Sequence, residues 1–341
     1  MIAPGSLLML GLAGPELTAA EVLWFRELQP VGFVLGSRNL VTPEQTRRLT
    51  DALRDLRQRQ PVVAIAQAGG PTAPLAGIAP LAPSASALVA HGNSKATGTA
   101  GLLTGELLRM LGVNFNFGPL LDLVQPPMAA SGLLDNGWGR DPQRVIDHAG
   151  QWNRWLRKRG IATAAKYFPA GGRATAPSPG ELPGTAVTLA ELLREDLLPY
   201  TALMPELDAI LVGHVMFPNL DAERPASLSP QVIRRLLRGQ LGFDHHLVLP
   251  AELGAISRHY EPAVAARMAL EAGNDVVLPG GDTGTAREVA AALATLPDGI
   301  RAEAWERVER LRDKLHWPTP WSAAKWTETC ASLATLAAEV G

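Results

Sequence analysis

The sequence predicts an α/β protein, a (β/α)8 barrel of the TIM type with extra C-terminal helices. Eight short apolar runs are continuous rather than alternating, as expected of parallel strands buried on both faces, and each precedes a helical pattern. The chain has 341 residues, of which 47% are hydrophobic, so it is long enough to bury the core of one such barrel. A doubly wound open sheet is the alternative, but the runs show no reversal of order, which favours closure.

The predicted strands share two features. Each is short, and many are followed by Gly or Pro, which suits the tight turns at the ends of barrel strands. In chain order the predicted strands are Leu7–Leu12, Gly32–Leu35, Val62–Ala66, Asn114–Phe117, Ala162–Lys166, Ala209–Val212, Leu247–Leu249 and Asp275–Leu278.

Helix-start signals lie between these runs. An N-cap residue accepts a hydrogen bond from the first turn, and Pro at the next position has its backbone dihedral already set for a helix. Three such pairs each predict a helix start: Thr42-Pro43, Asp141-Pro142 and Ser229-Pro230.

The C-terminal part of the chain is predicted to be a helical extension of the barrel. Residues 1–300 are predicted to form the barrel, and residues 301–341 a helical extension packed on it. Two helices are expected there, Ala302–Leu315 and Pro320–Val340, on either side of a Pro-rich break. Trp317, Trp321 and Trp326 are candidate contacts for a protein partner, although tryptophans in such a tail more often pack it on the barrel.

Charge and cysteine content exclude several classes. The formal net charge is −2, and no long run of Lys or Arg predicts a nucleic-acid partner. The densest basic stretch, Arg154 to Arg159, suits the solvent-facing side of a helix. Cys330 is the single cysteine, so no internal disulfide is possible, and no metal or other cofactor is expected. No apolar run reaches membrane-spanning length, and a cytoplasmic protein is expected.

Seven segments at predicted strand ends carry a family resemblance. Taken in this order, they resemble glycoside hydrolase family 3, in particular its single-domain bacterial β-N-acetylhexosaminidases of cell-wall recycling. The resemblance implies a barrel with its active site in the loops after the strands, and a small carbohydrate ligand. The segments are Val62–Gly70, Leu111–Asp122, Gly137–Pro142, Ala165–Pro169, Gly213–Pro218, Leu241–Asp244 and Ala272–Asp275.

The loops depart from what this resemblance implies for catalysis. A retaining glycosidase needs one carboxylate that attacks the sugar and a second group that donates a proton. The family places the attacking Asp after the seventh strand, where this chain has Leu249 or Pro250, depending on the register of the alignment. Glu252 is the nearest acid, and it comes two or three residues later.

The proton-donating pair and several sugar-holding positions also differ. The Asp and His that the family carries on the loop after strand five correspond to Pro177 and Pro179, which cannot transfer a proton. Ala66 and Ala68 stand where the resemblance implies Asp and Glu, and Asn136 where it implies Arg. The family mechanism therefore has no catalytic residue in this chain.

The remaining candidates are substrate-binding residues. Lys166 at the end of a buried strand either holds a ligand or pairs with an acid, and His214 is either a ligand contact or a satisfied core histidine. Tyr167 and Trp138 would stack on a sugar or pack at the barrel rim. Asn136 completes this set.

Three functions remain open at this point. The first is a catalytically impaired relative of family 3 glycoside hydrolases that still binds amino sugars or cell-wall fragments. The second is an active hydrolase of β-N-acetylhexosaminides or β-glucosides that uses Glu252 as nucleophile, with His214 or Lys166 assisting. The third is a non-catalytic scaffold that binds a protein partner.

Overall fold

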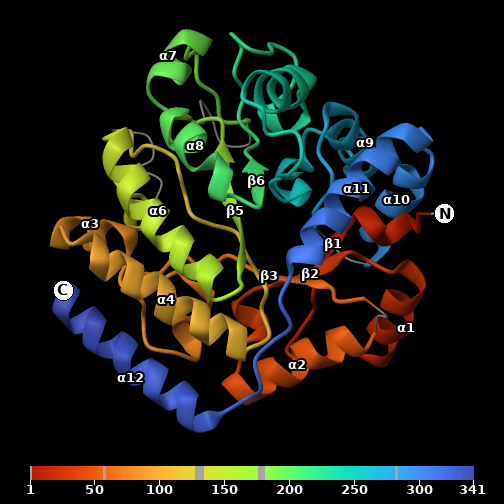
Figure 1. The fold of residues 1–341 in the computed structure, drawn as a ribbon. Helices are drawn as coiled ribbons and strands as arrows, with labels where there is room; N and C mark the ends of the chain where they lie inside the picture. Colours follow the sequence, from red (N-terminus) through yellow and green to blue (C-terminus); the bar gives the residue numbers. More distant parts are fainter. Residues whose placement is uncertain (1, 57–58, 127–133, 176–180, 281–282) are drawn as a thin grey trace.

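The computed structural model describes residues 2–56, 59–126, 134–175, 181–280 and 283–341. These residues form a seven-stranded parallel sheet whose strands neighbour one another in chain order, curled as Figure 1 shows. Every residue of the third, sixth and seventh strands is buried, as their continuous apolar sequences predict. The predicted fold class is confirmed. The strands are β1 (Met9–Gly11), β2 (Gly32–Leu35), β3 (Val62–Ile65), β4 (Phe115–Asn116), β5 (Ala162–Phe168), β6 (Ala209–Val212) and β7 (Leu247–Pro250).

The predicted eighth strand, Asp275–Leu278, is wrong as a regular strand. It makes one isolated parallel bridge, between Val277 and Leu8. The Val277 amide donates to the Leu7 carbonyl at 2.9 Å, and its carbonyl accepts from the Met9 amide at 3.0 Å. This segment therefore still joins the first edge of the sheet.

The same segment joins the last edge through Asp275. Its backbone amide donates to the Val248 carbonyl in β7 at 2.8 Å. Its carboxylate accepts from the Val248 amide at 2.8 Å, which takes the place of a backbone ladder bond and explains why no regular strand forms here. Arg238 and Arg307 pair with this buried carboxylate at 2.7 and 3.1 Å. The barrel is thus closed by a side chain as much as by backbone.

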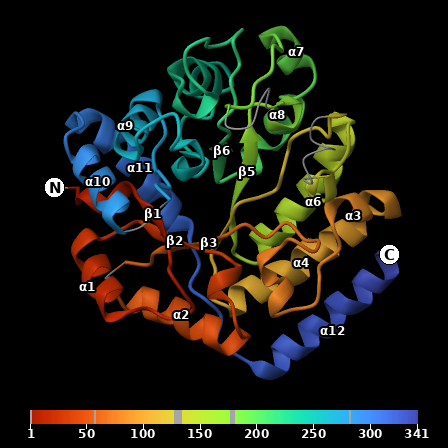
Figure 2. The ribbon, with the colours of Figure 1, turned by 180° about the vertical axis from the view of Figure 1, so that it is seen from behind.

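Helices surround the sheet, as the two opposite views in Figures 1 and 2 show. Thr42 and Asp141 cap α2 and α6 as predicted, and Ser229-Pro230 precedes a π-type helix over Gln231–Gln240. None of the helices in the described ranges combines the length and the apolar composition that crossing a membrane requires. The α-helices are α1 (Ala19–Leu28), α2 (Pro43–Asp55), α3 (Ala85–His91), α4 (Ser94–Met110), α6 (Pro142–Lys158), α7 (Leu189–Arg194), α8 (Leu198–Leu203), α9 (Pro262–Ala272), α10 (Thr283–Ala294), α11 (Asp298–Lys314) and α12 (Ala323–Val340).

The two tail helices correspond to α11 and α12. In both views α12 lies along α4, and the two helices contact each other. The Arg47 guanidinium in α2 donates to the Thr319 carbonyl at 2.7 Å and so fixes the connecting segment. Trp321 and Trp326 pack together with ring centroids 5.7 Å apart, whereas Trp317 is 63% exposed.

We expect Asp275→Asn to lower the free energy of unfolding by about 3–5 kcal/mol, because the change removes the carboxylate charge that pairs with the buried Arg238 guanidinium and with the partly buried Arg307. Urea unfolding followed by circular dichroism measures it. Glu306→Gln, which breaks the exposed Glu306–Arg310 pair on α11, is the matched control and is expected to cost about 0.5 kcal/mol or less. Equal losses in the two variants would contradict the role given to Asp275 in closure.

Candidate functional site

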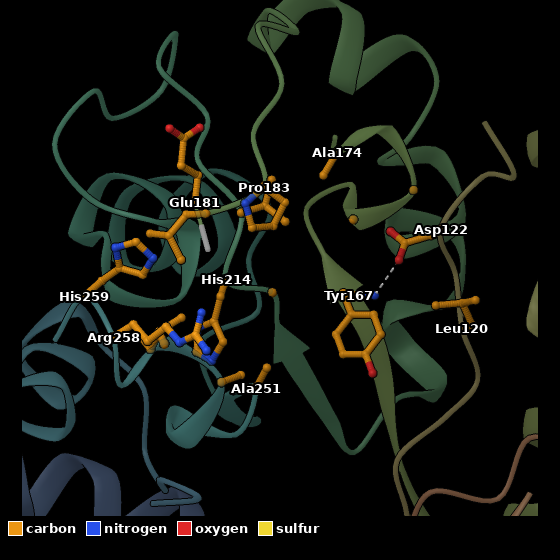
Figure 3. A pocket seen from close by; sticks show the side chains of 17 residues that line it. Leu120, Asp122, Tyr167, Ala174, Glu181, Pro183, His214, Ala251, Arg258 and His259 are labelled. Atoms are coloured by element: carbon orange, nitrogen blue, oxygen red, sulfur yellow. Dashed lines mark hydrogen bonds between the residues drawn. The ribbon is translucent and has the colours of Figure 1, made fainter. Parts of the chain in front are cut away.

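A cavity of about 540 Å³ opens at the carboxyl ends of β5, β6 and β7; we call it the β5–β7 cavity. Its walls come from residues that end these strands or follow them closely, together with the loop after β4, which is where a parallel barrel places its functional loops. Figure 3 shows Tyr167 and Asp122 on one side and His214, Arg258 and His259 on the other. Its lining is Leu120, Asp122, Tyr167, Gly171, Gly172, Ala174, Glu181, Leu182, Pro183, Gly213, His214, Val215, Ala251, Ala255, Ile256, Arg258 and His259.

Asp122 is the buried carboxyl group in this wall. Its Oδ2 accepts a hydrogen bond from the Tyr167 amide at 3.0 Å, so it fixes the end of β5. A Cβ on Gly172 would lie 2.3 Å from the Leu123 carbonyl oxygen, so only glycine allows the loop after β5 to approach this closely. Burial raises the pKa of Asp122 to about 7, against the opposing effect of backbone amides at Tyr167, Gly171 and Gly172.

His214 follows β6, and both of its ring nitrogens have protein partners. Nδ1 lies 2.6 Å from the Ser227 hydroxyl, and Nε2 lies 3.1 Å from the backbone carbonyl oxygen of Glu252. A carbonyl only accepts, so Nε2 carries the proton and the Ser227 hydroxyl donates to Nδ1. Burial lowers the pKa of His214, and the ring is therefore neutral at pH 7.

The side chain of Glu252 does not lie in the β5–β7 cavity. A Cβ placed on Gly280 would come within 2.6 Å of Glu252 Oε1, and one on Gly254 within 3.4 Å, so the carboxylate lies against these two glycines. There it lines a second recess, of about 630 Å³, beside the ends of β1 and β2. His214 and Glu252 are therefore brought together through a backbone carbonyl, and their side chains line different spaces.

Apolar side chains occupy the end of strand seven, where the family resemblance implies the attacking Asp. Leu249 and Pro250 are both buried within β7, and Ala251 is the residue of this segment that lines the β5–β7 cavity. Asp122 and Glu181 are the carboxyl-bearing residues among its described lining, and the Glu181 carboxylate points away from the other labelled side chains in Figure 3. Pro177 and Pro179 lie outside the described residues.

Lys166 and Tyr167 occupy the end of β5. Lys166 is 9% exposed, and its Nζ lies 5.4 Å from the centre of the Tyr167 ring. Burial lowers the pKa of Lys166 to about 8, partly offset by the charge of Asp122. Tyr167 lines the cavity, whereas Lys166 is not among the lining residues.

The structure places Trp138 and Asn136 elsewhere. Trp138 is buried and stacked on His148, with ring centroids 6.3 Å apart, so its faces are not open to a sugar. Trp138 lines a separate recess of about 560 Å³ with Arg144. Asn136 lies in a short 3-10 turn before it, and its buried Oδ1 has no hydrogen-bond partner among the described residues.

The sequence pattern did not show that Asp122, which fixes the end of β5 through its bond to the Tyr167 amide, also faces a cavity. It did not identify Arg258 and His259, which reach the cavity from the loop between β7 and α9. These two residues lie well beyond the end of β7, so their place in the sequence did not indicate that they reach the cavity. Among the described residues no group of three or more His, Cys, Asp or Glu side chains could hold a metal ion.

A parallel barrel with a cavity at the carboxyl ends of its strands defines the class of β/α barrels, in which these loops are the usual place for a ligand site. Residues 7–311 match the family described as "Glycosyl hydrolase family 3 N terminal domain". The chain therefore belongs to glycosyl hydrolase family 3.

Its relatives and structural neighbours agree with this assignment. A protein named Beta-hexosaminidase from Pseudomonas aeruginosa (strain PAO1) is 30% identical over 330 residues, which cover 96% of this chain and 97% of the relative. Native NagZ from Neisseria gonorrhoeae has a similar fold, with a TM-score of 0.85, 24% identity and 98% coverage of both chains. A fungal multi-domain GH3 β-N-acetylglucosaminidase gives a TM-score of 0.91 at 25% identity, with 99% of this chain aligned to 42% of that longer chain.

We expect Asp122→Asn to change the pH dependence of stability. The folded pKa of about 7 lies above the ordinary value of 3.8, so the folded state keeps a proton that the unfolded chain releases between these values. The unfolding free energy of the natural chain therefore falls as pH rises through this window, by roughly 4 kcal/mol at most, relative to the variant, whose amide does not titrate.

Urea unfolding at pH 5 and pH 8.5 checks this expectation. Asp313→Asn makes the same chemical change on an exposed side chain and controls for the loss of one negative charge. A stability difference between Asp122→Asn and the natural chain that stays constant with pH would show that the Asp122 carboxyl is not preferentially protonated in the folded state.

Proposed function

We propose that this chain binds a small N-acetylamino sugar, or a cell-wall fragment that carries one, in the β5–β7 cavity and does not cleave it by double displacement. The family and the relatives named Beta-hexosaminidase support the sugar class. The cavity volume of about 540 Å³ falls within the usual range of small-molecule sites, roughly 300–1,000 Å³.

One observation carries the proposal that cleavage is lost. The strand-seven residue that reaches the cavity is Ala251, and the nearest carboxylate in sequence, Glu252, lines a different recess. Double displacement needs a carboxylate that can reach the anomeric carbon and a proton donor about 5 Å away from it. A methyl group supplies neither an attacking oxygen nor a charge.

The proton donor is the second part of the argument. His214 is neutral because burial lowers its pKa, and its one N–H is already donated to the Glu252 carbonyl. Asp122 titrates near neutral pH, but one of its oxygens is held by a backbone amide. His214 therefore has no free N–H to offer a leaving group, and the unbonded Asp122 oxygen can hydrogen-bond a ligand.

Turnover of a chromogenic N-acetyl-β-D-glucosaminide tests the loss of cleavage. We expect no turnover above the uncatalysed rate, because acid–base help alone contributes about 10²–10⁴ in rate and the nucleophile adds more. Glu252→Gln is expected to behave as the natural chain does. Turnover that disappears in Glu252→Gln would instead establish a hydrolase that uses this residue.

A thermal-shift titration with N-acetylglucosamine tests binding. We expect ligand to raise the midpoint of unfolding of the natural chain, because it binds the folded state alone. Ala255→Trp should abolish this shift, because Ala255 is an exposed residue of the cavity lining and a larger side chain fills the opening. Ala331→Trp on the exposed face of α12 is the matched control and should keep the shift. Equal shifts in both variants would place the ligand elsewhere.

A further inference from the structure

A second concave site lies at the opposite end of the barrel. A recess of about 510 Å³ opens beside the first residues of β5 and the segment before β6, between the C-terminal ends of α6 and α11; we call it the α6–α11 recess. We infer that it binds a small soluble molecule that carries a phosphate or diphosphate group. Its lining is Arg154, Arg157, Lys158, Gly160, Ile161, Ala162, Glu206, Asp208, Lys314 and His316.

The charge of this recess has the opposite sign to the charge of the chain. Four Lys and Arg side chains line it against two carboxylates, whereas the whole chain has a formal net charge of −2. Cations gathered in a concavity create a local positive potential that attracts multivalent anions. The basic stretch from Arg154 to Arg159 thus forms part of a cavity wall, where the sequence predicted only a solvent-facing side of a helix.

The two arginines are held in place with donors to spare. The Arg157 Nε and Nη2 atoms donate to the two oxygens of Asp208 at 3.1 and 3.3 Å, and this carboxylate is itself buried and bound to the Thr163 amide at 3.1 Å. Arg154 binds Glu206 through the same two nitrogens at 3.0 and 2.9 Å. Each guanidinium keeps Nη1 without a hydrogen bond to a described residue, and a fixed guanidinium loses little entropy when it binds phosphate.

The two lysines have no carboxylate partner among the described residues. Lys158 lies over the Trp155 ring, with Nζ 4.0 Å from its centre, and Lys314 ends α11 on the other side of the recess. The His316 carbonyl accepts from Gln60 at 2.8 Å, which fixes the segment that carries its ring. Two ammonium groups and two anchored guanidiniums thus line one recess, three of them on α6 and the fourth at the end of α11. A phosphate group with several oxygens can accept hydrogen bonds from more than one of them.

Helix dipoles alone do not account for this arrangement. Lys and Arg stabilise helix C-termini, so their presence in the last turns of α6 and α11 is expected. That effect needs neither a recess nor a buried, backbone-bound carboxylate such as Asp208 to orient Arg157. No long basic run extends beyond the recess, which favours a small ligand over a nucleic acid.

This site is independent of the proposed sugar-binding function. Residues at the start of β5 line the recess, whereas Tyr167 near the end of the same strand lines the β5–β7 cavity. Ala162 and Tyr167 lie on opposite ends of one buried strand. A ligand in the recess therefore does not contact a sugar in the cavity.

Calorimetric titration with inorganic pyrophosphate, repeated at several sodium chloride concentrations, tests the inference. We expect saturable binding to the natural chain that weakens as sodium chloride is raised, because salt screens exposed charges. Lys158→Gln with Lys314→Gln should weaken it about tenfold or more, through the loss of two charge-assisted contacts. Both side chains are exposed, so the double variant is expected to fold normally.

The control removes the same charge elsewhere. Lys95→Gln with Lys325→Gln changes two lysines outside the recess and should bind pyrophosphate as the natural chain does. The inference is overturned by an absence of binding to the natural chain in the millimolar range. It is equally overturned when the two double variants lose affinity to the same extent, because net charge and not the recess then explains the binding.

Discussion

The architecture depends on the closure of the barrel by the segment around Asp275. A parallel sheet of seven strands has two open edges, and each edge exposes unpaired amides and carbonyls. Val277 bonds one edge and Asp275 the other, and the Asp275 carboxylate is neutralised by Arg238 and Arg307. A short chain segment thus joins both edges without forming a regular strand. Closure brings the carboxyl ends of all the strands to one face, so the position of the cavity follows from it.

At this face the backbone at Glu252 separates the β5–β7 cavity from the recess beside β1 and β2. The Glu252 carbonyl accepts from His214 on the side of the β5–β7 cavity, while the Glu252 side chain turns toward Gly280 on the other side. A family fold is therefore retained while the residue facing the cavity at strand seven is Ala251. Fold stability resides in the buried strands and the Asp275 network, and reactivity would reside in loop side chains, so the two can change separately.

The two ends of the barrel differ in the charge and the origin of the side chains that line their cavities. The β5–β7 cavity is built from strand-end loops around a buried carboxyl group, Asp122. The α6–α11 recess is built from helix ends and the starts of strands, with Arg157 anchored by a buried carboxylate. The two proposed ligand sites thus rest on side chains that the barrel core holds apart.

The sequence by itself determined the seven regular strands, the capped helices and the family, because continuous apolar runs and N-cap signals reflect local burial and local hydrogen bonding. It also located Tyr167 and His214, since residues directly after barrel strands face the mouth. Only the tertiary structure decided that Trp138 is buried and stacked on His148, and that Glu252 lines another recess. Side-chain direction in loops depends on contacts distant in sequence. For the same reason the sequence did not show that the eighth segment forms a single backbone bridge to β1 and meets β7 through the Asp275 carboxylate.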